Sequence, residues 1–166
     1  SGFNASFGEK PLDVDRLKLH VELYKEKDIQ VTLSQYNTID KSKVDKDNDI
    51  IYLDPPYIAS KFQYGGWVKN DELELLKFIT NLDKEGYKFI LSNTFSHKGV
   101  INNDLIEWSK NFNAYLIDMS YNAWSSRVTG VEREDATVEV LITNIGDAFK
   151  DLPDANVGKL STTELF

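Results

Sequence analysis

The residues best suited to do chemistry form the segment Asp54-Pro55-Pro56-Tyr57. The apolar run before it, residues 49–53, is typical of a buried strand, so the acid stands at the carboxyl end of a strand. Open α/β sheets bind their ligands at that edge. Proline lacks a backbone N–H and restricts the residue before it to extended geometry, so the strand stops there and its last carbonyls keep a fixed direction.

This combination suits a reaction on the exocyclic amine of a purine. The lone pair of that nitrogen is delocalised into the ring, which makes the nitrogen a poor nucleophile. The Asp54 carboxylate and the Pro55 carbonyl can each accept one N–H, and such fixed acceptors favour a pyramidal nitrogen whose lone pair points out of the ring plane. Tyr57 can stack on a base that has been taken out of a duplex. No general base with a shifted pKa is needed if the proton is lost after methyl transfer.

A simpler interpretation of the same segment stays open. Asp-Pro is a good turn opener, and the segment would then only end a strand. Its place directly after a buried strand, with a tyrosine as the next residue, favours the functional interpretation.

Hydrophobic periodicity predicts the elements that position this segment. Helices are predicted at residues 13–25, 70–85 and 103–110, and strands at 29–33, 49–53, 88–91, 114–119 and 137–143. Helices that alternate with buried strands indicate an α/β fold with a mostly parallel sheet. The last two strands have no helix between them, which predicts an antiparallel strand near the C-terminus.

Composition limits the class of protein. A chain of 166 residues favours one domain. It has no cysteine, and its two histidines, His20 and His97, lack metal-like spacing, so no metal site is predicted. Both histidines are interpreted as solvent-exposed, His97 in a loop. No apolar run approaches the roughly 20 residues of a membrane helix, and no signal-peptide pattern opens the chain.

The net charge of −8 argues against nucleic-acid binding, because phosphate contacts rest on lysine and arginine. Taken alone, the charge favours a small-molecule enzyme or an interaction module.

The sequence nevertheless resembles the Dam-like group (D12 class) of adenine-N6 DNA methyltransferases, found with restriction systems and in phages. Their catalytic motif is Asp-Pro-Pro-Tyr after a strand, as at 54–57. Residues 2–8 look like the segment that closes the family's target-recognition region. Residues 91–94 look like the strand end after the catalytic helix, and residues 139–144 look like the family's final strand. The four matches occur in family order over residues 2–145.

The resemblance implies a Rossmann-like methyltransferase sheet, present here in part, and S-adenosylmethionine as methyl donor, with no metal. It implies a target adenine flipped out of double-stranded DNA, in a cytoplasmic enzyme of bacterial or phage origin. By position, Asp54 would touch the adenine amine and the methionine part of the donor, and Tyr57 would stack on the base. An aspartate at the first motif position resembles the adenine enzymes rather than the cytosine-N4 enzymes. Residues 1–12 would be a remnant of the recognition region, 13–146 the catalytic α/β domain, and 147–166 a polar tail that is poorly ordered or docked.

One departure from the family is expected to matter. The family's cofactor motif, a Phe-x-Gly type segment, lies N-terminal to everything in this chain. The chain is therefore expected to be a fragment, one subunit of a split enzyme whose complementary chain brings the cofactor strand, or a remnant without activity. An acidic catalytic half is tolerable if the basic DNA-binding surface belongs to the other half.

Secondary site residues each have an ordinary alternative. Ser34 and Gln35 follow a predicted strand and would line the pocket for the donor's adenosine, or form a strand-end turn. Tyr64 and Trp67 would cover the flipped base or wedge the duplex, or pack on the sheet. Arg127 would contact a phosphate, which positions a complex without reading sequence, or pair with a nearby glutamate on the surface.

Two rival functions remain. The chain could be a non-catalytic binding or scaffold subunit that pairs with a complementary chain or with DNA. The Asp-Pro-Pro-Tyr motif also permits methylation of RNA or of free nucleosides.

Overall fold

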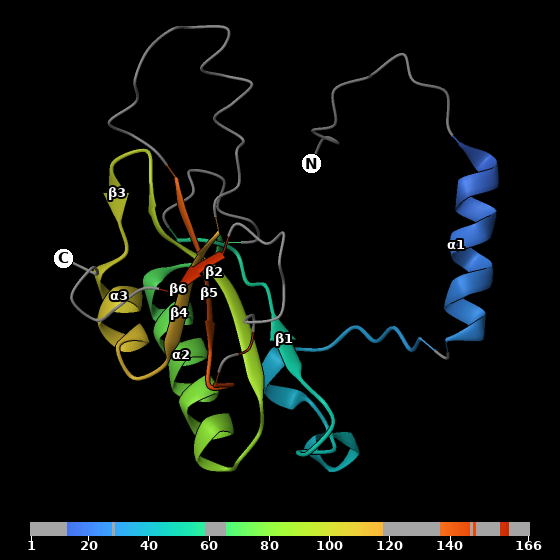
Figure 1. Ribbon diagram of the computed structural model, residues 1–166, viewed down its shortest axis with the longest axis horizontal. Helices are drawn as coiled ribbons and strands as arrows, with labels where there is room; N and C mark the ends of the chain where they lie inside the picture. The colour runs from blue at the N-terminus through green and yellow to red at the C-terminus, as the bar shows by residue number, and fades with distance from the viewer. Residues whose placement is uncertain are drawn as a thin grey trace, which may run out of the picture. The chain divides into compact units, whose positions relative to one another are not determined.

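The computed structural model describes residues 13–27, 29–58, 66–117, 137–146, 148 and 157–159 (Figure 1). The chain divides into two compact units, Ser1–Ile39 and Asp40–Phe166. Among the described residues, none of the helices has the length and apolar character needed to cross a membrane.

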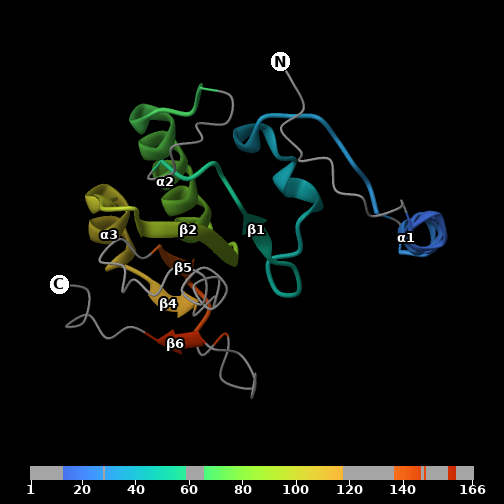
Figure 2. The ribbon, with the colours of Figure 1, turned by 90° about the horizontal axis from the view of Figure 1, so that it is seen from above.

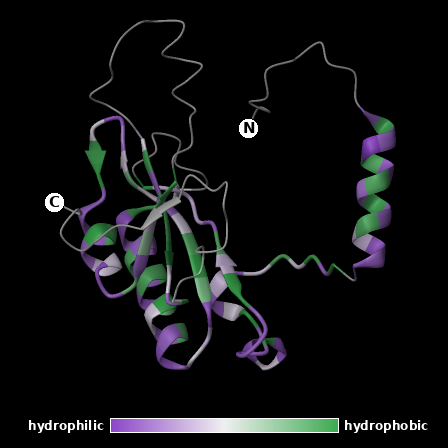
Figure 3. Ribbon diagram, viewed as in Figure 1, coloured by the Kyte–Doolittle hydropathy of each residue, from purple (hydrophilic) through white to green (hydrophobic). Residues whose placement is uncertain are grey.

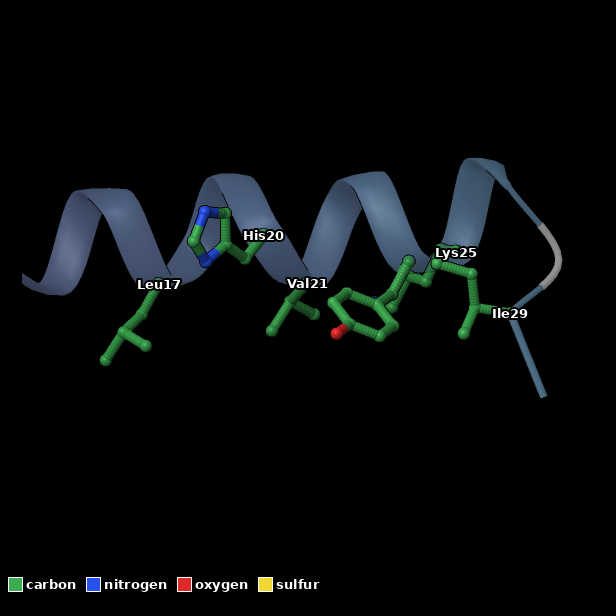
Figure 4. Close-up of a pocket in the computed structure, with 6 residues that line it drawn as sticks. Leu17, His20, Val21, Lys25 and Ile29 are labelled. Carbon is green, nitrogen blue, oxygen red and sulfur yellow. The ribbon is translucent and has the colours of Figure 1, made fainter. Parts of the chain in front are cut away.

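The first unit contains the helix α1, Val14–Glu26, which confirms the helix predicted near 13–25. Asp13 caps it, because its carboxylate accepts the backbone N–H of Arg16 at 2.9 Å. None of its residues is buried, and hydrophobic and hydrophilic residues alternate along it (Figure 3). Figure 4 shows the side chains that line a hollow on this helix: Leu17, His20, Val21, Tyr24, Lys25 and Ile29. His20 is exposed, as predicted.

The segment after α1 does not form the strand predicted at residues 29–33. Val31 and Leu33 are 85% and 105% exposed. Alternating apolar residues form a strand only where a neighbouring strand supplies backbone hydrogen bonds. No described residue pairs with this segment in that way. A short 3₁₀ helix, Tyr36–Thr38 (η1), follows it.

The second unit is built on a sheet in the order β1-β2-β5-β4-β6, with β3 paired to β2 (Figure 2). A 3₁₀ helix, Lys41–Lys43 (η2), precedes the sheet. The strands have these bounds: β1 Ile51–Leu53, β2 Phe89–His97, β3 Val100–Ile101, β4 Asn113–Ile117, β5 Val138–Thr143 and β6 Val157–Lys159. The last of these lies in the predicted C-terminal tail and pairs with β4.

The predicted mostly parallel sheet is wrong for the neighbouring strands in the described part of the chain. Only β1 and β2 are parallel neighbours, and the other four pairs are antiparallel. The strands β2 and β4 run in the same direction, as expected for strands joined through a helix, but β5 lies between them in the opposite direction. The predicted antiparallel strand near the C-terminus is therefore confirmed, and its insertion makes most neighbouring pairs antiparallel.

The helices α2, Lys69–Lys84, and α3, Asn103–Ser109, were both predicted, and both contact β2 (Figure 2). Apolar residues of the helices and strands pack together in a core. Its fully buried members include Leu75, Ile79, Leu82, Phe89, Leu91, Leu105, Val140 and Ile142. The sequence predicts Asn70 as the N-cap of α2 and Gly86 as its stop. The N-cap is instead Val68, because Asp71 accepts the Val68 N–H at 2.8 Å. Gly86 adopts φ +86° after the helix, which confirms the predicted stop.

Candidate active site

The segment Asp54–Tyr57 leaves the sheet directly after β1. The last residue of β1, Leu53, pairs in parallel with Leu91 of β2. Asp54 therefore follows the carboxyl end of β1 and lies beside Ser92, which stands inside β2. The side chain of Asp54 is exposed, whereas both prolines and Tyr57 are half-buried. The acid is accessible to a ligand while the residues after it are held against the protein.

The hydroxyl of Tyr57 links this segment to β2. It lies 3.1 Å from Asp54 Oδ1 and 3.1 Å from Ser92 Oγ. A tyrosine has one hydroxyl hydrogen, and a carboxylate can only accept, so Tyr57 donates to Asp54. The Ser92 hydroxyl must then donate to Tyr57. The chain of donors runs from Ser92 through Tyr57 to Asp54.

Electrostatics keep this hydroxyl in its donor form. Burial raises the pKa of Tyr57, and the negative charge of Asp54 and the hydrogen bond to it raise the pKa further. The hydrogen bond from Ser92 lowers that pKa; it is a weaker influence than burial but a stronger one than either contribution of Asp54. Tyr57 is therefore neutral at physiological pH. Asp54 Oδ2 has no hydrogen bond to any residue that the structure describes, so it can accept from a ligand.

The residue next to Ser92 is held on the other face of the sheet. Asn93 Nδ2 donates to Glu72 Oε1 at 3.3 Å, and Asn102 Nδ2 donates to the same oxygen at 2.9 Å. Both amide orientations are set by backbone donors, because Asn93 Oδ1 accepts from Thr94 N and Asn102 Oδ1 accepts from Leu105 N. Glu72 thus ties the start of α2 to the middle of β2 and to the cap of α3.

Glu72 is a residue that the sequence analysis missed. Its side chain is 2% exposed, and burial raises its pKa, opposed by the hydrogen bonds from Asn102 and Asn93. An acid in the first turn of α2 is expected at the surface, where it suits the helix dipole. The available signal was its spacing: position 72 precedes Leu75, Leu76 and Ile79 at helical intervals and belongs to the apolar face.

Of the other predicted site residues, the structure describes Trp67, Ser34 and Gln35. Trp67 is half-buried, between Gly66 at φ +79° and the start of α2. Ser34 and Gln35 are exposed in the first unit, where the carbonyl of Gln35 accepts the N–H and hydroxyl of Thr38. Tyr64 and Arg127 lie outside the described residues.

The prediction that His97 is a solvated loop residue is wrong. It ends β2 and is half-buried, and its Nδ1 lies 2.7 Å from Thr137 Oγ1. The strand β2 is nine residues long and continues past the predicted end, because β3 and β5 both supply backbone partners there. Among the described residues, no cluster of three or more histidines and carboxylates is arranged to hold a metal ion.

Comparison with known proteins gives one family and several relatives. The model of the D12 class N6 adenine-specific DNA methyltransferases matches residues 2–123. The Type II methyltransferase M.FokI of Planomicrobium okeanokoites is 34% identical over 154 residues, covering 86% of this chain and 23% of the relative. The modification methylase StsI of Streptococcus sanguinis is 36% identical over 126 residues, covering 70% of this chain and 18% of the relative.

A third relative, the modification methylase LlaI of Lactococcus lactis subsp. lactis, is 32% identical over 124 residues. That match covers 70% of this chain and 18% of the relative. The chain therefore spans between 18% and 23% of the length of these relatives.

Proposed function

Because the chain belongs to the D12 class N6 adenine-specific DNA methyltransferases, we propose that it forms the catalytic part of such an enzyme. The enzyme would transfer a methyl group from S-adenosylmethionine to N6 of an adenine flipped out of double-stranded DNA. The observation that carries this proposal is the link between Asp54 and Tyr57 at the carboxyl edge of β1. A carboxylate and an aromatic ring are held together there by a hydrogen bond.

The two carboxylate oxygens of Asp54 would have separate tasks. Oδ1 accepts from Tyr57, which leaves Oδ2 to accept one N–H of the adenine amine. The Pro55 carbonyl would accept the second N–H. The lone pair of N6 would then attack a methyl carbon in line. The donor would supply the methyl group: the N–C bond would form as its C–S bond breaks, with the electron pair of that bond left on sulfur. Asp54 would stabilise the positive charge that develops on N6, and the amine proton would then pass to solvent water.

The residues present fit a methyl donor of this class in one respect. S-adenosylmethionine supplies an activated methyl group on a positively charged sulfur, and its methionine part carries an ammonium group. Asp54 is an exposed carboxylate at the edge where α/β sheets bind ligands, so we assign it to that ammonium group as well. Ser34 and Gln35 are proposed to line the pocket for the adenosine part. A metal has no role in this chemistry.

We also propose that the second unit is part of a Rossmann-like sheet. The strands β1, β2 and β4 share one direction and are joined through α2 and α3, as in two successive strand–helix–strand units. Trp67 and Tyr64 would lie beside the flipped base, and Arg127 would contact a DNA phosphate.

The test is methyl transfer from labelled S-adenosylmethionine to adenine-containing duplex DNA, measured on the species that contains this chain. Asp54→Ala is expected to lower kcat by about 10²–10³, the effect of losing one preorganised polar group. The matched control is Asp47→Ala, an exposed acid in the turn before β1, which should methylate at the normal rate. If Asp54→Ala methylates like the control, the mechanism is wrong. Duplex DNA, single-stranded RNA and adenosine as substrates decide the target class.

A second candidate is a chain that acts only together with a complementary chain. The net charge of −8 favours it, because such a chain has little electrostatic attraction for DNA of its own. Calorimetry of S-adenosylmethionine with the isolated chain separates the two. Tight binding contradicts the partner requirement, whereas no binding, with activity in a heavier species of measured native mass, supports it.

A further inference from the structure

We propose that Ser92 is a positioning residue for methyl transfer, acting on the flipped base through the hydroxyl of Tyr57. The proposal rests on the proposed function, since it presumes that the ring of Tyr57 stacks on adenine. Ser92 lies in the family-like segment 91–94 but outside the Asp-Pro-Pro-Tyr motif, and no role was predicted for its side chain. Its role follows from the 3.1 Å contact between its Oγ and the tyrosine hydroxyl.

The direction of the hydrogen bonds gives Ser92 a defined task. Tyr57 has one hydrogen, which it donates to Asp54, so its oxygen needs a separate donor to hold the other side. Ser92 supplies that donor. With its hydroxyl held from both sides, the ring of Tyr57 can turn neither about its Cα–Cβ bond nor away from Asp54 without breaking a hydrogen bond. The hydroxyl is thus occupied, and only the ring face remains to meet a base.

The backbone that carries Ser92 is itself rigid. Ser92 pairs with Leu141 of β5, and its neighbour Leu91 pairs with Leu53 at the end of β1. The next residue, Asn93, is anchored by its amide to the buried Glu72. A hydrogen-bond donor on an exposed loop would lose conformational entropy when it orders the ring of Tyr57. Ser92 has already lost that entropy on folding, so it orders Tyr57 before the base arrives.

This arrangement predicts where a loss will appear in the kinetics. Phosphate contacts supply most of the affinity for DNA, and they do not involve Ser92. A mobile ring makes stacking on the flipped adenine less favourable after DNA is bound. Ser92→Ala should therefore lower kcat by roughly two- to tenfold, the effect of one hydrogen bond, and change the KM for DNA by less than about twofold.

The experiment is a double-mutant cycle on the methylating species that contains this chain. It compares Ser92→Ala, Tyr57→Phe and the double variant for kcat, KM and the fluorescence of 2-aminopurine at the target position. If Ser92 acts through the hydroxyl, Ser92→Ala has no further effect in the Tyr57→Phe background. Ser92→Thr, which keeps the hydroxyl, should restore kcat. The control Ser96→Ala makes the same change four positions further along β2 and should leave kcat unchanged.

Each outcome of this cycle either supports or contradicts the role of Ser92. A loss in Ser92→Ala that does not exceed the loss in Tyr57→Phe, with no added loss in the double variant and less 2-aminopurine signal, supports the proposal. A wild-type kcat for Ser92→Ala overturns it, and so does a double variant whose loss is the product of the two single losses. The Tyr57→Ala variant tests the proposed function separately from the role of Ser92. If it methylates normally, stacking by Tyr57 fails and the proposed function with it. If it is inactive while Ser92→Ala is normal, only the role of Ser92 fails.

Discussion

Ser92 and Asn93 are consecutive residues of β2 whose side chains serve opposite faces of the sheet. Ser92 hydrogen-bonds the hydroxyl of Tyr57, and Asn93 donates to the buried carboxylate of Glu72. Side chains alternate between the two faces of a strand, so this division needs no distortion of the backbone. This part of β2 is thereby held from the helix side, while on its other face it contacts Tyr57 of the segment Asp54–Tyr57. Stability and activity can be changed separately on the two faces.

Glu72→Ala should lower the free energy of unfolding by about 2–5 kcal/mol, because it leaves the amide donors of Asn93 and Asn102 buried without an acceptor. Urea denaturation of the chain measures this. Glu72→Gln keeps an oxygen that can accept both bonds and should cost about 1 kcal/mol or less. The control is Glu74→Ala, on the exposed side of α2, with an expected change within about 0.5 kcal/mol. Equal effects at positions 72 and 74 would contradict the network.

The same carboxyl group should make stability depend on pH. Burial raises the pKa of Glu72 above its ordinary value of 4.5, so the folded state holds this proton more tightly than the unfolded state. The part of the free energy of unfolding that comes from this tighter proton binding is therefore fully present below pH 4.5. It is lost as pH rises through the pKa that Glu72 has in the folded state. The free energy of unfolding of wild type minus that of Glu72→Gln should therefore decrease as pH rises through that range, because only wild type has this proton to lose. A difference in the free energy of unfolding between the two proteins that stays constant with pH would contradict this prediction.

The hydroxyl and the ring of Tyr57 should contribute to kcat by different amounts. Tyr57→Phe keeps the ring and loses only the hydrogen bonds to Asp54 and Ser92, so we expect kcat to fall roughly two- to tenfold. Tyr57→Ala also loses the stacking surface, worth about 1–3 kcal/mol per base, and should fall by a further factor of about 5–150. Single-turnover methylation at saturating DNA measures both. Identical rates for the two variants would show that the ring does not stack.

Asn144 is predicted to act in folding rather than in catalysis, although it ends one of the family-like motifs. Its Oδ1 accepts from Phe89 N at 3.1 Å, and its Nδ2 donates to Asp83 Oδ1 and Tyr87 O, both at 2.8 Å. Asn144→Ala should therefore lower the free energy of unfolding by about 2–4 kcal/mol, since two backbone groups lose a partner. Asn81→Ala, at an exposed position of α2, is the control in the same denaturation experiment. A stable but inactive Asn144→Ala variant would assign this residue to the site instead.

The helices and the Asp-Pro-Pro-Tyr motif could be predicted because their sequence patterns are local. The apolar spacing of α2, the cap at Asp13 and the stop at Gly86 each depend on residues a few positions apart. The strand predicted at residues 29–33 failed for the opposite reason. Alternation shows that a segment can form a strand, but pairing requires a neighbour from elsewhere in the chain. The length of β2 was underestimated for the same reason, since β3 and β5 extend it.

The sequence by itself determined that an acid, two prolines and a tyrosine follow a strand, and with them the family and the chemistry to expect. Local stereochemistry suffices for that, because proline has no backbone N–H to donate and restricts the residue before it. The prediction that this strand is buried is wrong, because Leu53 is its one buried residue and Tyr52 is 60% exposed. Only the tertiary structure decided that β5 lies between β2 and β4, that Glu72 is buried, and that Ser92 meets the hydroxyl of Tyr57. These contacts join residues 21–35 positions apart, and packing rather than spacing brings such residues together.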